Sequence, residues 1–404
     1  TIIMANHTSN HFNKYFFYYL LFLTISSVFF ISENYLLHTN NSMAEWVINY
    51  QGGFGRRGLL GELFLQISLL TEVGLKDIIL YFLYLVFGVY YLSVYFFFKE
   101  IDLKPIFIIA IFSPLFLIFP LAELEALGRK DILIPIFFIF FAYLYQRFEF
   151  YKLVLSLTII YTILLLTHEI SIFYLPFFYF IILFKLNKIK LLNFVILLLM
   201  SVYFLFLIFL LSDSAHSNQE IDQMCKKLLN SFSTECGLGA SVLNRTLMTN
   251  IKELGNINIT HILRALWIFF LGSFALFLSL KNSQYKNEKL TFWSKKISFH
   301  LIFLIIFFPT LIPFLIAVDW GRWFNLSYTM SILFYFFCIK NNLIYLTESN
   351  FIKYIENISK KKLLYFFIIF ILCFTWNPKA VYHEDIGSVP IYRMISKIIK
   401  YSTK

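Results

Sequence analysis

The sequence predicts an all-α protein, a bundle of transmembrane helices that forms one integral membrane domain over residues 1–404. Of the 404 residues, 59% are hydrophobic and only 14% are charged, which is too little polar surface to cover a soluble protein with such a core. Apolar runs of roughly 15–22 residues recur along the whole chain, as in polytopic membrane proteins. The chain has no repeat of fixed period and no linker that would separate a soluble domain.

The apolar runs predict about eleven spans. We expect them at about 15–31, 78–98, 105–122, 132–146, 153–166, 170–184, 191–211, 264–280, 297–318, 327–339 and 363–376. The first run follows a single lysine and precedes no small-residue cleavage site, so we expect a retained helix and not a cleaved signal. Prolines lie within or beside several spans, where they would kink helices and could open a cavity; they are at positions 114, 120, 135, 176, 309 and 313.

Lysine-rich connections set the expected orientation. With the N-terminus in the cytoplasm, the lysine-dense loops become cytoplasmic, in agreement with the positive-inside rule; they are 99–104, 147–152, 185–190, 281–296 and 340–362. The net charge of +11 is then explained by these loops and by anionic lipid headgroups, and not by a nucleic-acid partner. The tail after Trp376 would lie outside, which agrees less well with the rule.

The same orientation places the unusual polar clusters together on the outer side. They are the outer loop 33–77, the segment 123–131, the dipeptide His168-Glu169, the outer loop 212–262 and the segment 319–323. Clusters on one face predict one site. The second long loop also holds Cys225 and Cys236, for which an oxidising periplasm allows a disulfide without requiring one.

The first outer loop concentrates five glycines and two adjacent arginines in residues 52–62. Glycines let a backbone approach a ligand closely, and the guanidiniums of Arg56 and Arg57 suit phosphate oxygens. The run 59–70 predicts a short interfacial helix whose N-terminus, just behind the arginines, would add to anion binding. The match to G-x-G-x-x-G is not a dinucleotide motif, because no strand or βαβ unit surrounds it. The structural alternative is that the arginines anchor the chain to headgroups.

The dipeptide His168-Glu169 is expected at a turn between two short apolar runs. Ionisable side chains at a membrane edge are costly to bury unpaired, which makes them functional candidates. The zinc motif H-E-x-x-H is excluded because position 172 is isoleucine, and no other metal-ligand spacing occurs. The alternative is a structural pairing of Glu169 with an arginine such as Arg129. The segment that holds Arg129 and Asp131 is expected to be a solvated loop unless these two face the cavity.

The segment Asp319-Trp320-Gly321-Arg322-Trp323 is expected to be a tight outer connection between two spans. Its tryptophans are typical of the interfacial aromatic belt, and its Asp and Arg could form a local salt bridge. The functional alternative is that Arg322 makes a second phosphate contact while a tryptophan face stacks on a sugar ring.

With its large outer loop and arginine-bearing outer motifs, the chain resembles polytopic bacterial glycosyltransferases of surface-polysaccharide assembly. These are the Wzy-type O-antigen and capsule polymerases and, more distantly, other transferases of the GT-C class. The resemblance rests on length, span number and overall plan, and covers most of the chain. It implies polymerisation of undecaprenyl-diphosphate-linked oligosaccharide units on the periplasmic face of the inner membrane, beside other polysaccharide-assembly proteins, without nucleotide sugar or obligatory metal or other cofactor.

The resemblance also implies roles for particular residues. Arg56, Arg57 and Arg322 would hold the diphosphate as charge develops on the leaving group. His168, Glu169 or Glu45 would take the proton of the acceptor hydroxyl. The remaining residues expected to line the substrate site are Arg129, Asp319, Trp320 and Trp323.

One departure keeps two alternatives open. Polymerases of this type often carry their arginines in later outer loops, whereas the densest pair here lies in the first. An acidic residue in the first outer loop, such as Glu45 or Glu33, is typical of a GT-C transferase that uses a polyprenyl-phosphate monosaccharide and could use a divalent cation. The other alternative is a polysaccharide flippase or another transporter, for which twofold internal similarity would be expected; none is seen.

Overall fold

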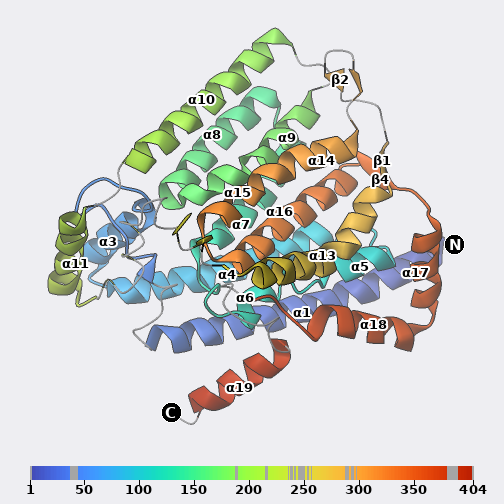
Figure 1. The fold of residues 1–404 in the computed structure, drawn as a ribbon, viewed down its shortest axis with the longest axis horizontal. Coiled ribbons are helices and arrows are strands. Elements are labelled where there is room, and N and C mark those ends of the chain that lie inside the picture. The colour runs from blue at the N-terminus through green and yellow to red at the C-terminus, as the bar shows by residue number, and fades with distance from the viewer. Residues whose placement is uncertain are drawn as a thin grey trace.

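The computed structural model describes most of the chain and confirms an all-α architecture (Figure 1). The described residues are 2–36, 44–186, 190–213, 217–234, 236, 240, 243, 251–252, 254–255, 257–286, 291–292, 295–296, 298–379 and 390–402. Within them, strand structure is confined to two short antiparallel pairs, β1 (Ser283–Tyr285) with β4 (Ile344–Leu346) and β2 (Thr291–Phe292) with β3 (Lys295–Lys296). The sequence patterns did not predict these pairs.

The helices follow one another through the chain, many of them with short connections. The α-helices are α1 (Ile2–Leu36), α3 (Leu59–Thr71), α4 (Leu75–Phe98), α5 (Pro105–Ile111), α6 (Phe119–Ala122), α7 (Leu133–Arg147), α8 (Phe150–Thr167), α9 (Leu175–Lys185), α10 (Leu191–Asp213), α11 (Asn218–Phe232), α13 (Ile259–Lys281), α14 (Phe299–Phe307), α15 (Ile312–Ile316), α16 (Trp320–Lys340), α17 (Asn350–Lys360), α18 (Lys362–Phe374) and α19 (Pro390–Ser402). The 3₁₀ helices are η1 (Lys130–Ile132), η2 (Glu169–Tyr174) and η4 (Phe308–Leu311).

Six helices of the described chain are long and apolar enough to cross a membrane, which supports a membrane protein. They are Phe12–Glu33, Leu75–Phe98, Phe150–Thr167, Leu191–Leu211, Ile259–Lys281 and Phe299–Ile316. The predicted count of about eleven is not supported. The other five expected spans, at 105–122, 132–146, 170–184, 327–339 and 363–376, fall in shorter, broken or internal helices.

The run 105–122 shows why length of apolar sequence overestimates spans. It divides into α5 and α6, separated by a turn around Ser113. The Ser113 hydroxyl donates to Gly272 O at 2.7 Å and accepts from Leu115 N at 3.2 Å. Pro120, at the start of α6, lacks the N–H that a continuous helix would need. This apolar segment therefore packs as irregular core structure between longer helices.

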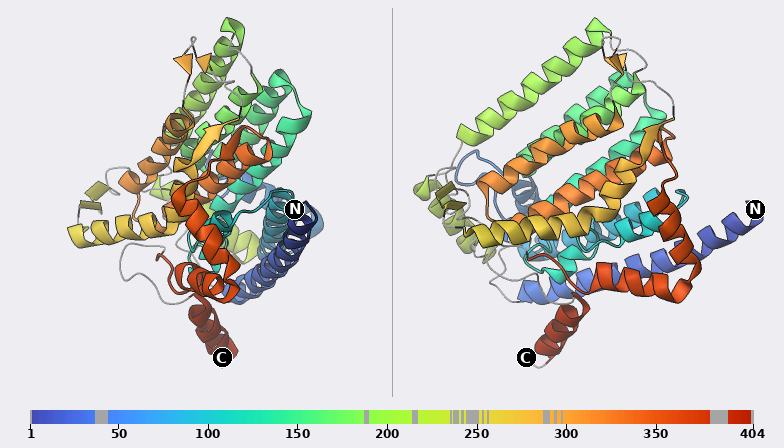
Figure 2. Two further views of the ribbon diagram at one scale, coloured as in Figure 1. Left: turned by 90° about the vertical axis from the view of Figure 1, so that its right-hand side faces the viewer. Right: turned by 45° about the vertical axis from the view of Figure 1, so that its right-hand side comes forward.

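Helix α16 is the internal helix of the bundle. It is long enough to span but is buried at nearly every position, including its serines and threonine. It packs against α7, α13 and α15, and α10, α14 and α16 run in similar directions (Figure 2). Because α16 is held on all sides, the side chains of its first turn have a fixed position.

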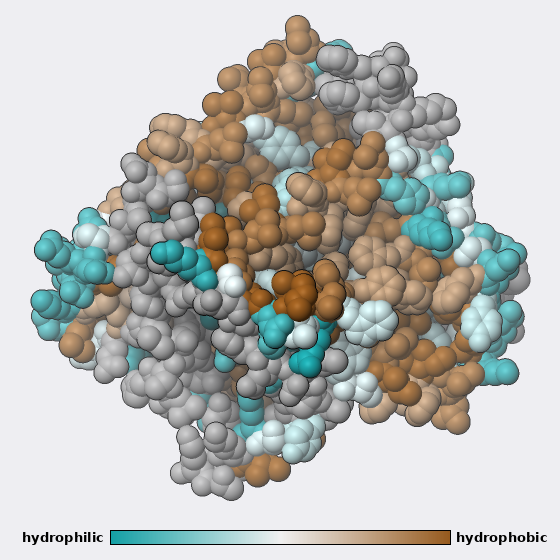
Figure 3. All heavy atoms as spheres, in the orientation of Figure 1, coloured by the Kyte–Doolittle hydropathy of each residue, from teal (hydrophilic) through white to brown (hydrophobic). Residues whose placement is uncertain are grey.

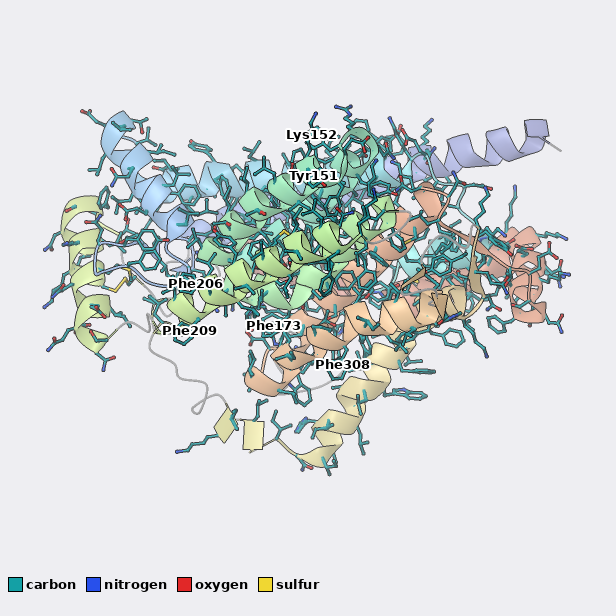
Figure 4. All side chains as sticks on the ribbon, turned by 90° about the horizontal axis from the view of Figure 1, so that it is seen from above. Tyr151, Lys152, Phe173, Phe206, Phe209 and Phe308 are labelled. Atoms are coloured by element: carbon teal, nitrogen blue, oxygen red, sulfur yellow. A yellow bond between two sulfur atoms is a disulfide. The ribbon has the colours of Figure 1, made fainter. Side chains whose placement is uncertain are left out.

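The molecular surface is apolar across the middle and polar at two ends. Hydrophobic residues cover the centre of the visible face, over α10, α14 and α13, whereas hydrophilic residues gather over α11 at one end and over α17 at the other (Figure 3). Seen from above, the exposed rings of Phe206, Phe209 and Phe308 lie on the outside of the bundle (Figure 4). An apolar middle between two polar ends is typical of a helical bundle whose central section is surrounded by lipid.

Three of the lysine-rich loops meet at one end of the bundle, in agreement with the charge pattern. Strand β1 pairs with β4, with Ser283 opposite Leu346, and so joins two of these loops. The Lys340 ammonium lies 3.0 Å from the Glu100 carboxylate and donates to Phe97 O at 3.3 Å, which brings in a third loop. We call this region, which includes Lys99, Lys185 and Lys340, the lysine end.

Candidate functional site

A group of charged side chains gathers at the end of the bundle opposite the lysine end. Four segments contribute: the loop before α3, the turn that leads into η1, the junction of α8 with η2, and the start of α16. We call this group the charge cluster; its members are Glu45, Arg56, Arg57, Arg129, Lys130, Asp131, His168, Glu169, Asp319 and Arg322. The ion pairs among them confirm that segments predicted to share one face lie together.

The first ion pair of the cluster joins the first outer loop to the α8–η2 junction. Arg57 Nε donates to both Glu169 oxygens, at 3.0 and 2.9 Å, and Arg57 Nη2 donates to Oε1 at 2.8 Å. Burial would raise the pKa of Glu169, but the Arg57 charge outweighs it and holds that pKa well below its usual range. Arg56 lies at the edge of the same pair, with its Nη1 3.9 Å from Glu169 Oε1.

Arg57 also has an unusual backbone. Its φ of 67° places it in the left-handed region, which is uncommon for a residue with a Cβ. The Lys130 ammonium donates to the Arg57 carbonyl at 2.8 Å. Such a conformation persists only where the surroundings hold it, and here the Glu169 carboxylate fixes the side chain while Lys130 fixes the main chain.

The second group of ion pairs centres on Asp131. Arg322 Nε and Nη2 donate to Asp131 Oδ2 at 3.0 and 2.8 Å, and His168 Nε2 lies 2.7 Å from Oδ1. Arg322 also pairs with Asp319 and lies over the Trp323 ring, 4.9 Å from its centroid. Burial opposes ionisation of Asp131, yet Arg322 and His168 hold its pKa well below the usual range. Asp131 is thus an ionised acceptor for both partners.

The third ion pair joins Glu45 to Arg129. Burial raises the pKa of Glu45, but Arg129, followed by Arg322 and Arg57, lowers it to about 2. Arg129 donates to Oε1 of Glu45. The other oxygen, Oε2, is buried and accepts no hydrogen bond from any described residue.

The neighbouring Trp46 donates its indole N–H to Gly128 O, which ties the first outer loop to the turn that carries Arg129. This bond keeps Glu45 within reach of its arginine.

Lys130 is a member of the cluster that the sequence reasoning missed. It was expected on a solvated loop, but its side chain is completely buried. Its ammonium contacts the Arg57 carbonyl and the face of Trp46, 5.6 Å from the ring centroid, and within the described chain it forms no ion pair. Burial lowers the pKa of Lys130 to about 7 even though Glu45 acts to raise it.

The solvated-loop expectation for 123–131 is therefore wrong for most of its charged residues. Glu123 is buried and accepts a hydrogen bond from Asn377 Nδ2 at 3.2 Å, and Asp131 is held by Arg322. Glu125 alone of these carboxylates is exposed. The reason is that the segment runs between the short helix α6 and η1 inside the packed end of the bundle.

The segment 319–323 is not a loop. Asp319 caps α16 and Trp320 begins it, so Arg322 lies in the first helical turn. Trp323 is 1% exposed beneath Arg322, and so it has no free face for a sugar ring in this conformation. Trp320 is turned toward α15, where its indole N–H donates to Phe314 O at 3.1 Å. The local salt bridge, weighed as the structural alternative, is formed between Asp319 and Arg322.

The glycines of the first outer loop are explained by close packing within the chain. A Cβ on Gly61 would lie 1.8 Å from Ile48 O, one on Gly58 2.2 Å from the Tyr50 ring, and one on Gly52 2.2 Å from Glu220 O. Glycine at these positions thus lets α3 and α11 pack against the loop. The expectation that they admit a ligand to the backbone is not needed to account for them.

The expected short helix after the arginines is present as α3, which begins at Leu59. Its first-turn carboxylate, Glu62, accepts hydrogen bonds from Tyr50 N at 3.1 Å and Gln51 Nε2 at 3.3 Å. This end of α3 is thereby engaged with its own loop.

Helix α11 covers the glycine-rich loop from the second outer loop. Lys227 Nζ donates to Gln51 O at 2.8 Å, and Glu220 lies against Gly52. Cys225 in this helix forms a disulfide with Cys236, so the pairing that the sequence left open is made. The disulfide links the middle of α11 to the chain that follows the helix.

The structure thus brings together all the predicted charged residues of the site, and leaves the two tryptophans beside or beneath it. Five cationic side chains face four carboxylates and one histidine. Glu45 Oε2 and His168 Nδ1 are among the buried polar atoms that have no hydrogen-bond partner in the described chain. Over the same residues, no three His, Cys, Asp or Glu side chains gather as metal ligands would. The cluster can bind an anion through its arginines and transfer a proton through its histidine.

Comparisons of this chain with protein-family models, with curated proteins and with solved structures find no match.

Proposed function

We propose that this chain is a membrane glycosyltransferase that polymerises undecaprenyl-diphosphate-linked oligosaccharide units on the outer face of the bacterial inner membrane. The observation that supports it is the charge cluster, where arginines from separate segments converge at the end of the bundle away from the lysines. A substrate with an anionic, lipid-embedded end fits that location. On this proposal the lysine end faces the cytoplasm.

The carboxylates paired with the arginines occupy the positions that phosphate oxygens would take. Arg57 presents its fork of N–H donors to Glu169, and Arg322 presents two donors to Asp131. Planar bidentate recognition of this kind serves phosphate equally well. Donor binding would exchange these carboxylates for the diphosphate, and the arginines would then stabilise the charge that develops on the leaving group.

The protonation state around Asp131 makes His168 the better candidate for the base. Asp131, whose pKa is held well below its usual range, would accept a hydrogen bond from His168 Nε2–H, and in that tautomer the lone pair lies on Nδ1. Nδ1 has no other partner among the described residues. The acceptor hydroxyl would attack the anomeric carbon, the bond from that carbon to the diphosphate would break, and the hydroxyl proton would pass to Nδ1.

The test is chain growth by the purified protein given its lipid-linked repeat unit. Arg57→Ala and Arg322→Ala should abolish long glycan at normal protein abundance, whereas Arg147→Gln, at an exposed position in the last turn of α7, should leave it unchanged. Since Arg57→Ala strands Glu169 in a buried site, the double variant Arg57→Met/Glu169→Leu controls for folding. A full glycan ladder from both single variants would refute the phosphate role.

A second candidate function has one observation in its favour. Glu45, an acidic residue of the first outer loop, lies inside the cluster with Oε2 unused. This suits a GT-C transferase that adds one sugar from a polyprenyl-phosphate donor, with Glu45 as the base or as a ligand of a divalent cation. Addition of a single sugar in the same assay would favour this function over polymerisation. Movement of the lipid across vesicles with no change in its glycan would contradict both and favour a transporter.

A further inference from the structure

At the lysine end, a groove of about 480 Å³ opens between the N-terminal half of α1 and the end of α4. Its wall includes the side chains of Asn13, Lys14, Tyr18, Tyr95 and Lys99. This groove lies on the opposite end of the bundle from the charge cluster, and nothing in the proposed transfer reaction uses it. Its location and its lining residues support a separate inference.

No described carboxylate forms an ion pair with the two lysines that line this groove. Glu100 also lines it, but that carboxylate is 3.0 Å from the ammonium of Lys340. Lys99 places its ammonium over the Phe96 ring, 4.5 Å from the centroid, and neither Lys99 nor Lys14 forms an ion pair with a described residue. Two cations at one opening favour an anion.

Contacts between α1 and α4 hold the two walls of the groove together. Asn13 Nδ2 donates to Lys99 O at 3.2 Å and so links the N-terminal half of α1 to the end of α4. Phe17 of α1 packs edge-on against Tyr95 of α4, with centroids 5.4 Å apart. These two contacts hold the lysines on either side of a fixed opening.

Below the groove, both helices present an apolar surface outward. On α1, Leu21, Phe22 and Ile25 are 43%, 51% and 61% exposed, and on α4, Leu85 and Leu92 are 62% and 51% exposed. Exposed aliphatic side chains at this depth of a membrane protein contact acyl chains. Tyrosines above them, at Tyr18 and Tyr95, are typical of the headgroup level.

We propose that this groove binds one anionic phospholipid, with its phosphate between Lys14 and Lys99 and its acyl chains along α1 and α4. A free phosphate would share the charge contacts but would gain nothing from the apolar surface below, which is why the proposal commits to a lipid. Basic pockets between transmembrane helices at the cytoplasmic surface bind lipid headgroups by this combination of charge and apolar contact.

The test is lipid retention by the purified full-length protein, measured by native mass spectrometry after exchange into phosphatidylglycerol or phosphatidylcholine. One phosphatidylglycerol molecule should stay bound at detergent concentrations that remove phosphatidylcholine. The variant Lys14→Gln/Lys99→Gln should bind it roughly 30-fold more weakly, from the loss of two charges near the membrane surface. The matched control is Lys152→Gln/Lys190→Gln, two exposed lysines outside the groove, one in the first turn of α8 and one directly before α10; it should bind as the unaltered protein does.

Each other outcome overturns the proposal. Equal retention of the two lipids would show that charge does not select the occupant, and equal loss in both double variants would show a diffuse effect of lysine number. Displacement of the lipid by millimolar inorganic phosphate would identify a phosphate site instead. Because the readout is binding and not glycan growth, its result is independent of whether the chain is a glycosyltransferase.

Discussion

The two ends of the bundle handle buried positive charge in different ways. In the charge cluster, Arg57 and Arg322 each meet a carboxylate through two N–H donors. At the lysine end, Lys185 donates to Tyr145 O at 2.7 Å and lies 4.7 Å from the Tyr145 ring centroid, and no carboxylate of the described chain pairs with it. The first arrangement neutralises charge and fixes geometry, whereas the second leaves net positive charge, which is what orients a membrane protein.

Lys130 belongs to the charge cluster but has contacts of the lysine-end type. It uses a carbonyl and an aromatic face, as Lys185 does, although carboxylates lie nearby. The comparison therefore predicts large effects where a paired charge is removed from the cluster, and small effects where a pair at the lysine end is removed.

The largest effect should follow from Glu169→Ala. This change leaves Arg57 buried without its carboxylate, and loss of one partner of a buried ion pair costs about 3–5 kcal/mol. The measurement is the free energy of unfolding in mixed detergent micelles. The double variant Arg57→Met/Glu169→Leu should recover most of that loss, since it removes both charges. If Glu169→Ala costs less than about 1 kcal/mol, the pair does not fix this end of the bundle.

The buried lysine should make stability depend on pH in the alkaline range. Lys130 titrates at about 7 when folded and at its ordinary value of 10.5 when unfolded. Between these values the unfolded chain binds the extra proton, so stability rises with pH from about 7 toward 10.5, by at most about 1.4 kcal/mol per pH unit. Unfolding measured from pH 7 to 10 should show a steeper rise for the unaltered protein than for Lys130→Met. Identical slopes would mean that Lys130 keeps its proton when folded.

The carboxylates of the cluster act in the acid range of pH, where stability also rises with pH. The pKa of Glu45 is lowered to about 2, so its stabilisation is complete above the ordinary value of 4.5 and is lost as the pH falls from there toward 2. The acid and alkaline ranges of the curve of stability against pH therefore depend on different members of the same cluster.

The members of the cluster were predictable from sequence, but their pairing was not. Charge in an apolar chain is informative, so residues such as Arg57, Glu169 and Arg322 stand out, and the positive-inside rule puts them at one end. Which carboxylate meets which arginine depends on where irregular segments such as the turn before η1 pack. Lys130 was missed because one more lysine in a charged run carries no signal of burial.

The membrane spans show the same limit of prediction from sequence. Apolar length cannot separate a helix that crosses the membrane from one broken inside the protein, such as the α5–α6 run with its Ser113 turn. Nor can it identify an internal helix such as α16, whose serines and tyrosines are buried against other helices. Both depend on tertiary contacts.

The packing role of the glycines gives a smaller effect with a matched control. Gly61→Ala would place a Cβ 1.8 Å from Ile48 O, a backbone atom that cannot rotate away, and should cost about 1–3 kcal/mol by overpacking. Gly88→Ala, in the interior of α4 with nothing within 4 Å of its Cβ, should stabilise by about 0.5–1 kcal/mol. The same unfolding measurement compares the two. If Gly61→Ala leaves the free energy of unfolding unchanged, close packing does not explain this glycine. The hypothesis that it lets a ligand approach the backbone would then be favoured.

The smallest effect should come from the lysine end. Glu100→Gln removes the carboxylate partner of Lys340, but the Glu100 side chain is 60% exposed and Lys340 retains the Phe97 carbonyl and the face of Tyr143, 5.0 Å from its centroid. Exposed ion pairs contribute about 0–1 kcal/mol, so the free energy of unfolding should change by no more than that. A loss as large as that of Glu169→Ala would show that the lysine end also depends on charge pairing. The two ends would then differ in residue type alone, and the argument that only the charge cluster has its geometry fixed by ion pairs would fail.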